Sequence, residues 1–407
     1  MAIAASTLKV PHDFFWGAAT SSHQVEGDNR FNDWWAWEQV SLVPERSGRA
    51  CDHYNQYEKD LDIAQKLGHN AYRFSIEWSR VERSPGNFSE EDIVHYEKVI
   101  GACRARKLTP IVTLHHFTNP IWFVAEGGWV SPKSPELFVR YVRRVTERLH
   151  TQVSWWITIN EPTVLVHEGY LAGRWPPGKR SPLLAVKAVR NLVKAHRLAY
   201  QAIRDCSKES SRLYIGLAHH VRCYDPCRRQ SRADRWAAKM RHWLGNEWFL
   251  NACRGTMDFL GVNYYTRDFL RFPGKVCPPS HHRSAGPRGC MDWEIYPQGL
   301  CRALSDLKQY GLPILVAENG VCTDDDMIRW DFIRNHLSEM GKAMAGGAQV
   351  VGYLYWSLLD NFEWAHGFAP RFGLVEVDYG TMERKVRPCA EKLMNLICAR
   401  EIPLDIS

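Results

Sequence analysis

The segment Trp155-Trp156-Ile157-Thr158-Ile159-Asn160-Glu161-Pro162 decides how the fold of this chain is predicted. Its first five residues are apolar, aromatic or β-branched, which is typical of a short strand buried on both faces of a sheet. Two polar residues follow, and Pro162 then turns the chain. Strands of this kind belong to parallel sheets whose faces are covered by helices.

Seven further runs of this type occur along the chain, each separated from the next by a segment long enough for at least one amphipathic helix. The alternation predicts a parallel sheet, and eight strands without a Pro/Gly/Ser-rich linker favour one closed (β/α)8 TIM barrel. We therefore predict a single α/β domain over residues 1–407, with its functional site at the carboxyl ends of the strands. The predicted strands are Phe14–Ala18, Ala71–Ile76, Pro110–Leu114, Trp156–Ile159, Leu213–Ala218, Phe259–Val262, Ile314–Ala317 and Val350–Tyr355.

The segments between the runs show helical spacing of apolar residues, and they should cover the outside of the barrel. The predicted helices include Tyr54–Leu67, Ser134–Leu149, Pro182–Ile203 and Arg329–Ala345. The stretches Cys223–Arg235 and Thr266–Asp292 lack such patterns, so we predict loops there, over the carboxyl-end face.

The composition limits the class of protein. The 407 residues carry a net charge of +7 with 45% hydrophobic and 24% charged residues, as in a globular protein. The basic residues are scattered, so we expect no nucleic-acid partner. No run approaches the roughly 20 apolar residues of a membrane-spanning helix, and residues 1–10 lack the pattern of a signal peptide. We therefore expect a cytoplasmic protein without a membrane partner.

The cysteines do not suggest a metal or disulfide framework. Twelve occur at irregular intervals, and a chain of this length can build its core without disulfides, so most are expected to be free thiols. The closest pair, Cys223 and Cys227, has no second pair at zinc-site spacing, so no metal is expected. The GxGxxG fingerprint is absent after the first run, so no dinucleotide cofactor is expected.

Two glutamates stand at the ends of predicted strands. Glu161 closes the fourth run, and Glu318 follows the seventh run directly. Polar residues at these ends face the mouth of a barrel, and cleavage of a glycosidic bond needs two carboxyl groups in one cleft. The 17 tryptophans supply the flat apolar surfaces that ring-shaped ligands such as sugars bind. For either glutamate alone, a structural ion pair with an arginine is the alternative.

Five motifs extend this interpretation over nearly the whole chain, from about Phe14 to about Arg387. They are Phe15-Trp-Gly-Ala-Ala-Thr-Ser-Ser-His-Gln-Val-Glu-Gly27, Tyr72-Arg-Phe-Ser-Ile-Glu-Trp-Ser-Arg80, Thr158-Ile-Asn-Glu-Pro162, Glu318-Asn-Gly320 and Trp356-Ser-Leu-Leu-Asp-Asn-Phe-Glu-Trp364. Together they resemble the family-1 glycoside hydrolases, the β-glucosidase family. The resemblance implies a retaining mechanism with Glu161 as general acid/base and Glu318 as nucleophile, their carboxyl groups about 5–5.5 Å apart.

The resemblance also implies roles for further positions. Arg73 and Asn263 are expected to support the nucleophile, and the Arg73 guanidinium should favour the charged form of Glu318. Trp356 resembles the platform beneath the sugar ring, and Trp293 resembles a tryptophan on the aglycone side. The residues expected to bind substrate are Gln24, His116, Asn160, Tyr265, Trp293, Trp356, Glu363 and Trp364.

The implied activity is hydrolysis of terminal non-reducing β-D-glucosyl residues, with galactosyl or fucosyl residues as further substrates, by double displacement and without a cofactor. The implied partners are small-molecule β-glycosides or oligosaccharides. Two alternatives stay open: a transglycosylating β-glycosidase with the same residues, and a non-catalytic sugar-binding barrel. The ranking of the sugars, the natural aglycone and the oligomeric state are also open.

The chain is shorter than is usual for this family, and the missing part lies between the fifth and sixth runs. We therefore expect a more open aglycone side that tolerates bulky or hydrophobic aglycones. The histidine doublets at 219–220 and 281–282 lack metal-ligand spacing, and we predict that they are solvent-facing loop residues.

Overall fold

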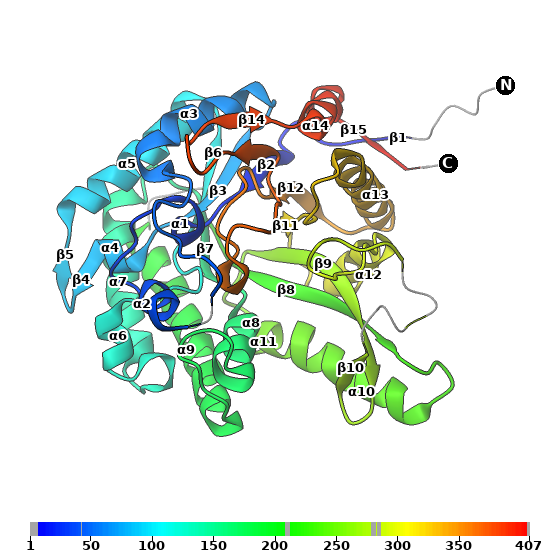
Figure 1. The fold of residues 1–407 in the computed structure, drawn as a ribbon, viewed down its shortest axis with the longest axis horizontal. Helices are drawn as coiled ribbons and strands as arrows, with labels where there is room; N and C mark the ends of the chain where they lie inside the picture. The colour runs from blue at the N-terminus through cyan, green and yellow to red at the C-terminus, as the bar shows by residue number, and fades with distance from the viewer. Residues whose placement is uncertain (1–6, 42, 208–211, 278–281, 283–285, 405–407) are drawn as a thin grey trace.

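Eight parallel strands close into a barrel at the centre of the computed structural model, which describes residues 7–41, 43–207, 212–277, 282 and 286–404 (Figure 1). The last strand around the barrel pairs in parallel with the first, which closes the sheet. In order around the barrel, the strands are β2 (Phe15–Ala19), β3 (Ala71–Ser75), β6 (Thr109–Thr113), β7 (Trp155–Asn160), β8 (Tyr214–Pro226), β9 (Phe259–Arg271), β11 (Ile314–Asn319) and β12 (Val350–Trp356).

The predicted TIM barrel is confirmed. All eight predicted strands are present, and six of them lie within two residues of their predicted bounds. The four predicted helices are present as α3 (His53–Lys66), α7 (Ser134–Leu149), α9 (Pro182–Cys206) and α13 (Asp326–Ala345). The other long outer helices are α5 (Glu90–Ala105), α12 (Gln298–Leu307) and α14 (Pro388–Ala399).

Helix α7 shows how local sequence produces the outer layer. Pro135 lies in its first turn, where the missing N–H costs no hydrogen bond. Five of its apolar residues share one face of the helix, and these five are buried against the rest of the protein. They are Phe138, Tyr141, Val142, Val145 and Leu149.

Two of the predicted loops are wrong. The stretch Cys223–Arg235 contains the end of β8 and the start of α10 (Arg232–His242), and Thr266–Asp292 contains the end of β9 and β10 (Lys275–Cys277). Strands β8 and β9 stay paired as far as Pro226 and Leu270, so they form a ribbon that projects from the barrel (Figure 1).

The ribbon was missed because charged residues interrupt its apolar pattern. These charges neutralise one another between the strands: Arg222 pairs with Asp268 at 2.9 Å, and Arg267 pairs with Asp225 at 3.1 Å. Opposite charges on neighbouring strands stabilise a sheet, whereas a search for apolar runs discards them.

The remaining elements are short and lie around the barrel. The additional strands are β1 (Thr7–Lys9), β4 (Glu82–Ser84), β5 (Asn87–Phe88), β13 (Val375–Val377), β14 (Arg384–Val386) and β15 (Glu401–Pro403), and β1 pairs with β15. The short helices are α1 (Ser22–Val25), α2 (Asp33–Val40), α4 (Trp78–Val81), α6 (Ile121–Ala125), α8 (Pro162–Val166) and α11 (Trp248–Ala252), with π-helices η2 (His167–Ala172) and η3 (Trp243–Glu247). Within the described ranges, every helix is too short or too polar to cross a membrane.

Four of the twelve cysteines form two disulfides, which the sequence did not predict. Cys227 is bonded to Cys277 at the end of the β8–β9 ribbon, and Cys290 is bonded to Cys322 just after β11. The other eight cysteines are free, as most were expected to be. The pairing was not predictable because the partners are 50 and 32 residues apart and meet only through the fold.

Candidate active site

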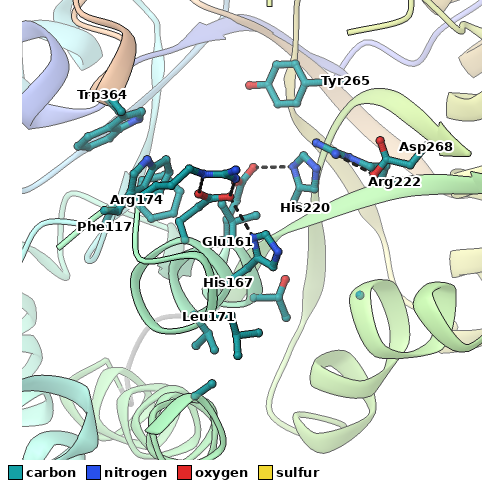
Figure 2. A pocket seen from close by; sticks show the side chains of 18 of the residues that line it. Phe117, Glu161, His167, Leu171, Arg174, His220, Arg222, Tyr265, Asp268 and Trp364 are labelled. Atoms are coloured by element: carbon teal, nitrogen blue, oxygen red, sulfur yellow. Dashed lines mark hydrogen bonds and ion pairs between the residues drawn. The ribbon is translucent and has the colours of Figure 1, made fainter. Parts of the chain in front are cut away.

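Glu161 and Glu318 line one cavity of about 1060 Å³ at the carboxyl ends of the barrel strands. Figure 2 shows this cavity around Glu161. Glu318 lies in β11, and Glu161 directly follows β7 and precedes α8. The backbone of Glu161 is left-handed, with φ of 44°. This conformation costs a residue with a side chain about 1 kcal/mol, so the surrounding structure must hold Glu161 in place.

Both oxygens of the Glu318 carboxyl group accept hydrogen bonds. Arg73 Nη1 donates to Oε1 at 2.6 Å, and the Tyr265 hydroxyl donates to Oε2 at 2.7 Å. Arg73 is fully buried, and it is fixed further by Thr113 Oγ1 at 3.1 Å and by the Ala317 carbonyl at 3.2 Å. The predicted contact between Arg73 and Glu318 is therefore present.

Glu161 is held by a different pair of side chains. Asn263 Nδ2 donates to Glu161 Oε1 at 2.7 Å, and His220 Nδ1 lies 3.2 Å from the same oxygen. Asn263 was predicted to support Glu318, but the structure places its amide against Glu161 and Asn160. The prediction fails because β9 points Asn263 and Tyr265, two residues apart on one face of the strand, at different glutamates.

The position of His220 also corrects a prediction. The doublet at 219–220 lies in β8, His219 is buried, and His220 contacts Glu161 (Figure 2). In the second doublet, His282 stacks on Phe269 at 3.7 Å, and His281 lies outside the described residues. Polar residues that directly follow a barrel strand face the mouth of the barrel. Applying this rule to the residues after the fifth predicted strand would have identified His220.

The predicted sugar-binding residues gather around the glutamates. Gln24 Nε2 donates to Glu363 Oε2 at 3.3 Å and to the carbonyl of Phe362 at 2.9 Å. His116 stacks between Trp356 and Trp364, with centroid distances of 5.8 and 6.2 Å. Burial holds the pKa of His116 well below its ordinary value, so its ring is neutral.

Trp293 and Tyr265 also line the cavity, with ring centroids 5.3 Å apart. Three predicted residues do not line the cavity: Arg73, Asn160 and Asn263 lie behind the carboxyl groups. Asn160 Oδ1 accepts from Arg73 Nη2 at 2.6 Å and from Asn263 Nδ2 at 3.1 Å. Asn160 therefore joins the partners of the two glutamates.

Burial and neighbouring groups shift the pKa of all three carboxyl groups in the cavity. Burial raises the pKa of Glu318 to about 7, with Arg73 opposing the rise and Glu161 adding to it. Burial and the charges of Glu318 and Glu161 raise the pKa of Glu363 to about 8. Burial also acts to raise the pKa of Glu161, but the charge and hydrogen bond of His220, together with Asn263, outweigh it and lower that pKa.

The expected effect of Arg73 is therefore only partly correct. The contact with Glu318 is present, but burial and the neighbouring carboxylate outweigh it. Because like charges in one buried site cannot all ionise near neutral pH, the glutamates hold at least one shared proton there. Such a cluster can both supply a proton to a leaving oxygen and present a carboxylate to carbon.

No group of three or more His, Cys, Asp or Glu side chains that could hold a metal ion occurs within the described part of the chain.

A TIM barrel that brings two glutamates, an arginine and stacked aromatic rings into one cavity defines the class of barrel glycosidases. The comparisons with known proteins name the family. The chain belongs to glycosyl hydrolase family 1, whose family model matches residues 6–256 and 250–401. This confirms the resemblance seen in the motifs, and it makes the chain a glycosidase.

The relatives cover nearly the whole chain. It is 32% identical to beta-glucosidase A of Thermotoga maritima, over 96% of this chain and 98% of that protein. A solved β-glycosidase from Pyrococcus horikoshii is 39% identical with a TM-score of 0.91, covering 98% of this chain and 96% of that one. The T. maritima β-glucosidase solved in complex with glucoimidazole is 30% identical with a TM-score of 0.90, covering 96% and 99%.

Proposed function

We propose that this glycosidase is an exo-acting β-glucosidase that removes terminal β-D-glucosyl residues with retention and also accepts β-D-galactosides and β-D-fucosides. The observation that carries the proposal is the placement of Glu161 and Glu318 in one cavity, each held by its own donors. Gln24, His116 and Glu363 offer donors and acceptors that suit the equatorial hydroxyls of glucose and also accept the C4 epimer.

In the first step, Glu318 attacks the anomeric carbon while Glu161 protonates the departing glycosidic oxygen. The pKa of Glu318 near 7 means that the shared proton must move toward Glu161 when the sugar binds. Arg73 and Tyr265 favour this movement because they hold the ionised form of Glu318.

In the second step, Glu318 is a neutral ester, so Glu161 loses a negative neighbour and its pKa falls further. Glu161 then removes a proton from water, which attacks the anomeric carbon from the side that the aglycone left. Two inversions give net retention. Trp356 serves as the platform beneath the ring, with Trp364 beside it.

The test compares wild type, Glu318→Ala and Glu161→Ala on matched 4-nitrophenyl β-glucoside, galactoside and fucoside. Loss of the nucleophile should lower kcat by about 10⁴-fold or more. Azide should restore Glu318→Ala and give the α-glycosyl azide, because azide enters from the face that Glu318 occupied. In Glu161→Ala, azide should instead attack the covalent intermediate from the other face and give the β-glycosyl azide.

The anomer of each azide product, read by NMR, separates the two roles. A β-azide from Glu318→Ala would contradict the assignment. A folded wild-type protein without activity on any of the three sugars would overturn the proposal and favour a sugar-binding barrel. Predominant transfer to sugar acceptors instead of water would make the enzyme a transglycosylase with the same site.

We also propose that residues 1–407 act as one catalytic unit, whereas the cytoplasmic location expected from the sequence depends on the state of its cysteines. The two disulfides weigh against a reducing compartment, because such bonds persist mainly in oxidising ones. A thiol count on denatured protein from its native cells tests the location: twelve free thiols fit the cytoplasm, and eight contradict it.

A further inference from the structure

The far end of the β8–β9 ribbon projects from the barrel, and α10 and β10 pack against it (Figure 1). We call residues 228–243 and 271–277 of this end the ribbon tip. The Cys227–Cys277 disulfide joins its two segments. Two residues of the ribbon tip, Arg241 and Val276, line the active-site cavity, and the others lie outside it.

The ribbon tip holds the net charge of the whole protein. It contains eight arginines and lysines and one acidic residue, whereas the complete chain has a net charge of +7. The rest of the chain is therefore neutral overall. The basic residues look scattered in the sequence because they belong to two distant segments, which meet only where α10 packs against the ribbon. The fold thus produces a strongly basic surface at one edge of the molecule.

The nearby carboxyl groups do not neutralise this surface. Asp234 is buried and pairs with Arg228 at 2.8 Å. Asp225 and Asp268 lie at the base of the ribbon tip, and they pair with arginines of the ribbon itself. Six basic side chains of the ribbon tip are exposed and form no ion pair with any described residue: Arg229, Arg232, Arg235, Lys239, Arg271 and Lys275.

Two large aromatic rings are exposed among these charges. Trp236 is 55% exposed and Phe272 is 50% exposed, and their ring centroids lie 6.1 Å apart. On α10, Trp236 follows Arg232 by four residues and precedes Lys239 by three, which puts the three side chains on one face of the helix. Isolated exposed apolar residues need no explanation, but neighbouring exposed rings mark a surface that contacts a partner.

This combination of side chains fits the surface of an anionic bilayer. Lysines and arginines are attracted to acidic headgroups, and aromatic rings bury their apolar part at headgroup depth. A nucleic-acid duplex would be attracted by the same charges, but it is held by polar contacts to phosphates and base edges. Such contacts would leave the rings of Trp236 and Phe272 without a role.

We propose that the ribbon tip docks on a bilayer that contains anionic phospholipid, with Trp236 and Phe272 among the headgroups and the basic side chains on the lipid phosphates. This contact needs no membrane-spanning helix, so it revises the expectation that the protein has no membrane partner. It does not depend on the proposed function, because Trp236, Phe272 and the six exposed basic residues lie outside the cavity.

The test is cosedimentation of the full chain with vesicles of phosphatidylcholine alone and of phosphatidylcholine mixed with phosphatidylglycerol. At about 0.05 M salt, we expect binding to the mixed vesicles to be stronger by about tenfold or more. At about 0.5 M salt this difference should disappear, because salt screens the charges. Equal binding to the two kinds of vesicle at low salt, or no binding to the mixed vesicles, would overturn the inference.

Charge variants locate the contact. Arg232→Gln/Arg235→Gln should weaken binding to the mixed vesicles by about 20-fold, because each basic residue near an anionic surface contributes about fivefold. Lys98→Gln/Arg104→Gln is the matched control, because it removes two exposed charges from α5, on the other side of the barrel (Figure 1). Its binding should stay within about twofold of that of wild type. Equal losses in the two variants would show that net charge alone drives binding, and would contradict the inference.

A third variant tests the aromatic rings. Trp236→Ala/Phe272→Ala should weaken binding by about tenfold and keep the salt dependence, because apolar contacts are not screened. Unchanged binding would contradict the placement of the rings among the headgroups. A urea unfolding midpoint equal to that of wild type shows that each variant is folded. Wild type that binds duplex DNA but not the mixed vesicles would assign the ribbon tip to nucleic acid and overturn the inference.

Discussion

Glu161 Oε1 accepts a hydrogen bond from Asn263 Nδ2 and lies within hydrogen-bond distance of His220 Nδ1. Of these two side chains, only the histidine can carry a charge. These contacts lower the pKa of Glu161, which as the proposed general acid must nevertheless be protonated when the glycosidic bond breaks. His220 therefore limits the pH range over which Glu161 holds its proton. It acts through Glu161, so it is a positioning residue.

Replacing His220 should widen that range on the alkaline side. In His220→Ala, the pKa of Glu161 rises because a charge and a hydrogen bond are lost, and the alkaline limb of kcat/KM should move up by about one pH unit. His220→Asn can keep a hydrogen bond and should move it less. The measurement is the pH profile of kcat/KM on 4-nitrophenyl β-glucoside, with His12→Ala as a distant control. An unmoved limb in His220→Ala would mean that His220 only fills space.

At the scale of elements, the sequence predicted what depends on local periodicity. The eight strands and the outer helices follow from apolar spacing, and the strand-end rule found Glu161 and Glu318. Contacts between distant strands were not predictable in the same way. The ribbon of β8 and β9 depends on the pairs Arg222–Asp268 and Arg267–Asp225, which form only once the two strands lie side by side.

The position of the loop that carries Trp293 was not predictable from the sequence either, because a disulfide to a distant cysteine holds this loop. Cys290 is bonded to Cys322, and its N–H also donates to the Cys322 carbonyl at 2.8 Å. Cys322 follows the strand of Glu318, so the disulfide fixes the loop of Trp293, the proposed aglycone-side residue, relative to Glu318. Trp293 in turn packs on Tyr265 and Phe372.

Removing the Cys290–Cys322 disulfide should weaken substrate binding more than it slows the chemical step. In Cys290→Ser, the loop gains freedom, so KM for 4-nitrophenyl β-glucoside should rise about threefold while kcat stays within about twofold. Cys227→Ser removes the other disulfide at the end of the ribbon, and it should leave both constants close to those of wild type. Equal effects of the two variants would show that the Cys290–Cys322 bond stabilises the fold without positioning Trp293.

At the scale of the whole molecule, the barrel stabilises a site that is itself unfavourable. Three carboxyl groups meet in one cavity, and their raised pKa values at Glu318 and Glu363 mean that folding takes up protons. The sequence predicted these three residues but not their shifted pKa values, because burial and mutual repulsion exist only in the closed barrel. Stability must therefore depend on pH through the active site.

Glu363 gives the clearest test, because its pKa is raised from 4.5 to about 8. Below pH about 4.5 the carboxyl group is protonated in both states, and the associated stability is fully present. As the pH rises toward 8, the unfolded chain loses this proton first, so wild type is progressively destabilised. Glu363→Gln cannot ionise and should be more stable than wild type by about 4 kcal/mol at pH 8.5, and by less than about 0.5 kcal/mol at pH 4.5. Urea unfolding at the two pH values measures the difference.

Glu376→Gln is the control variant, because Glu376 is exposed. Its free energy of unfolding should stay within about 0.5 kcal/mol of that of wild type. A gain of equal size at both pH values would mean that Glu363→Gln stabilises by packing and not by removing a buried charge.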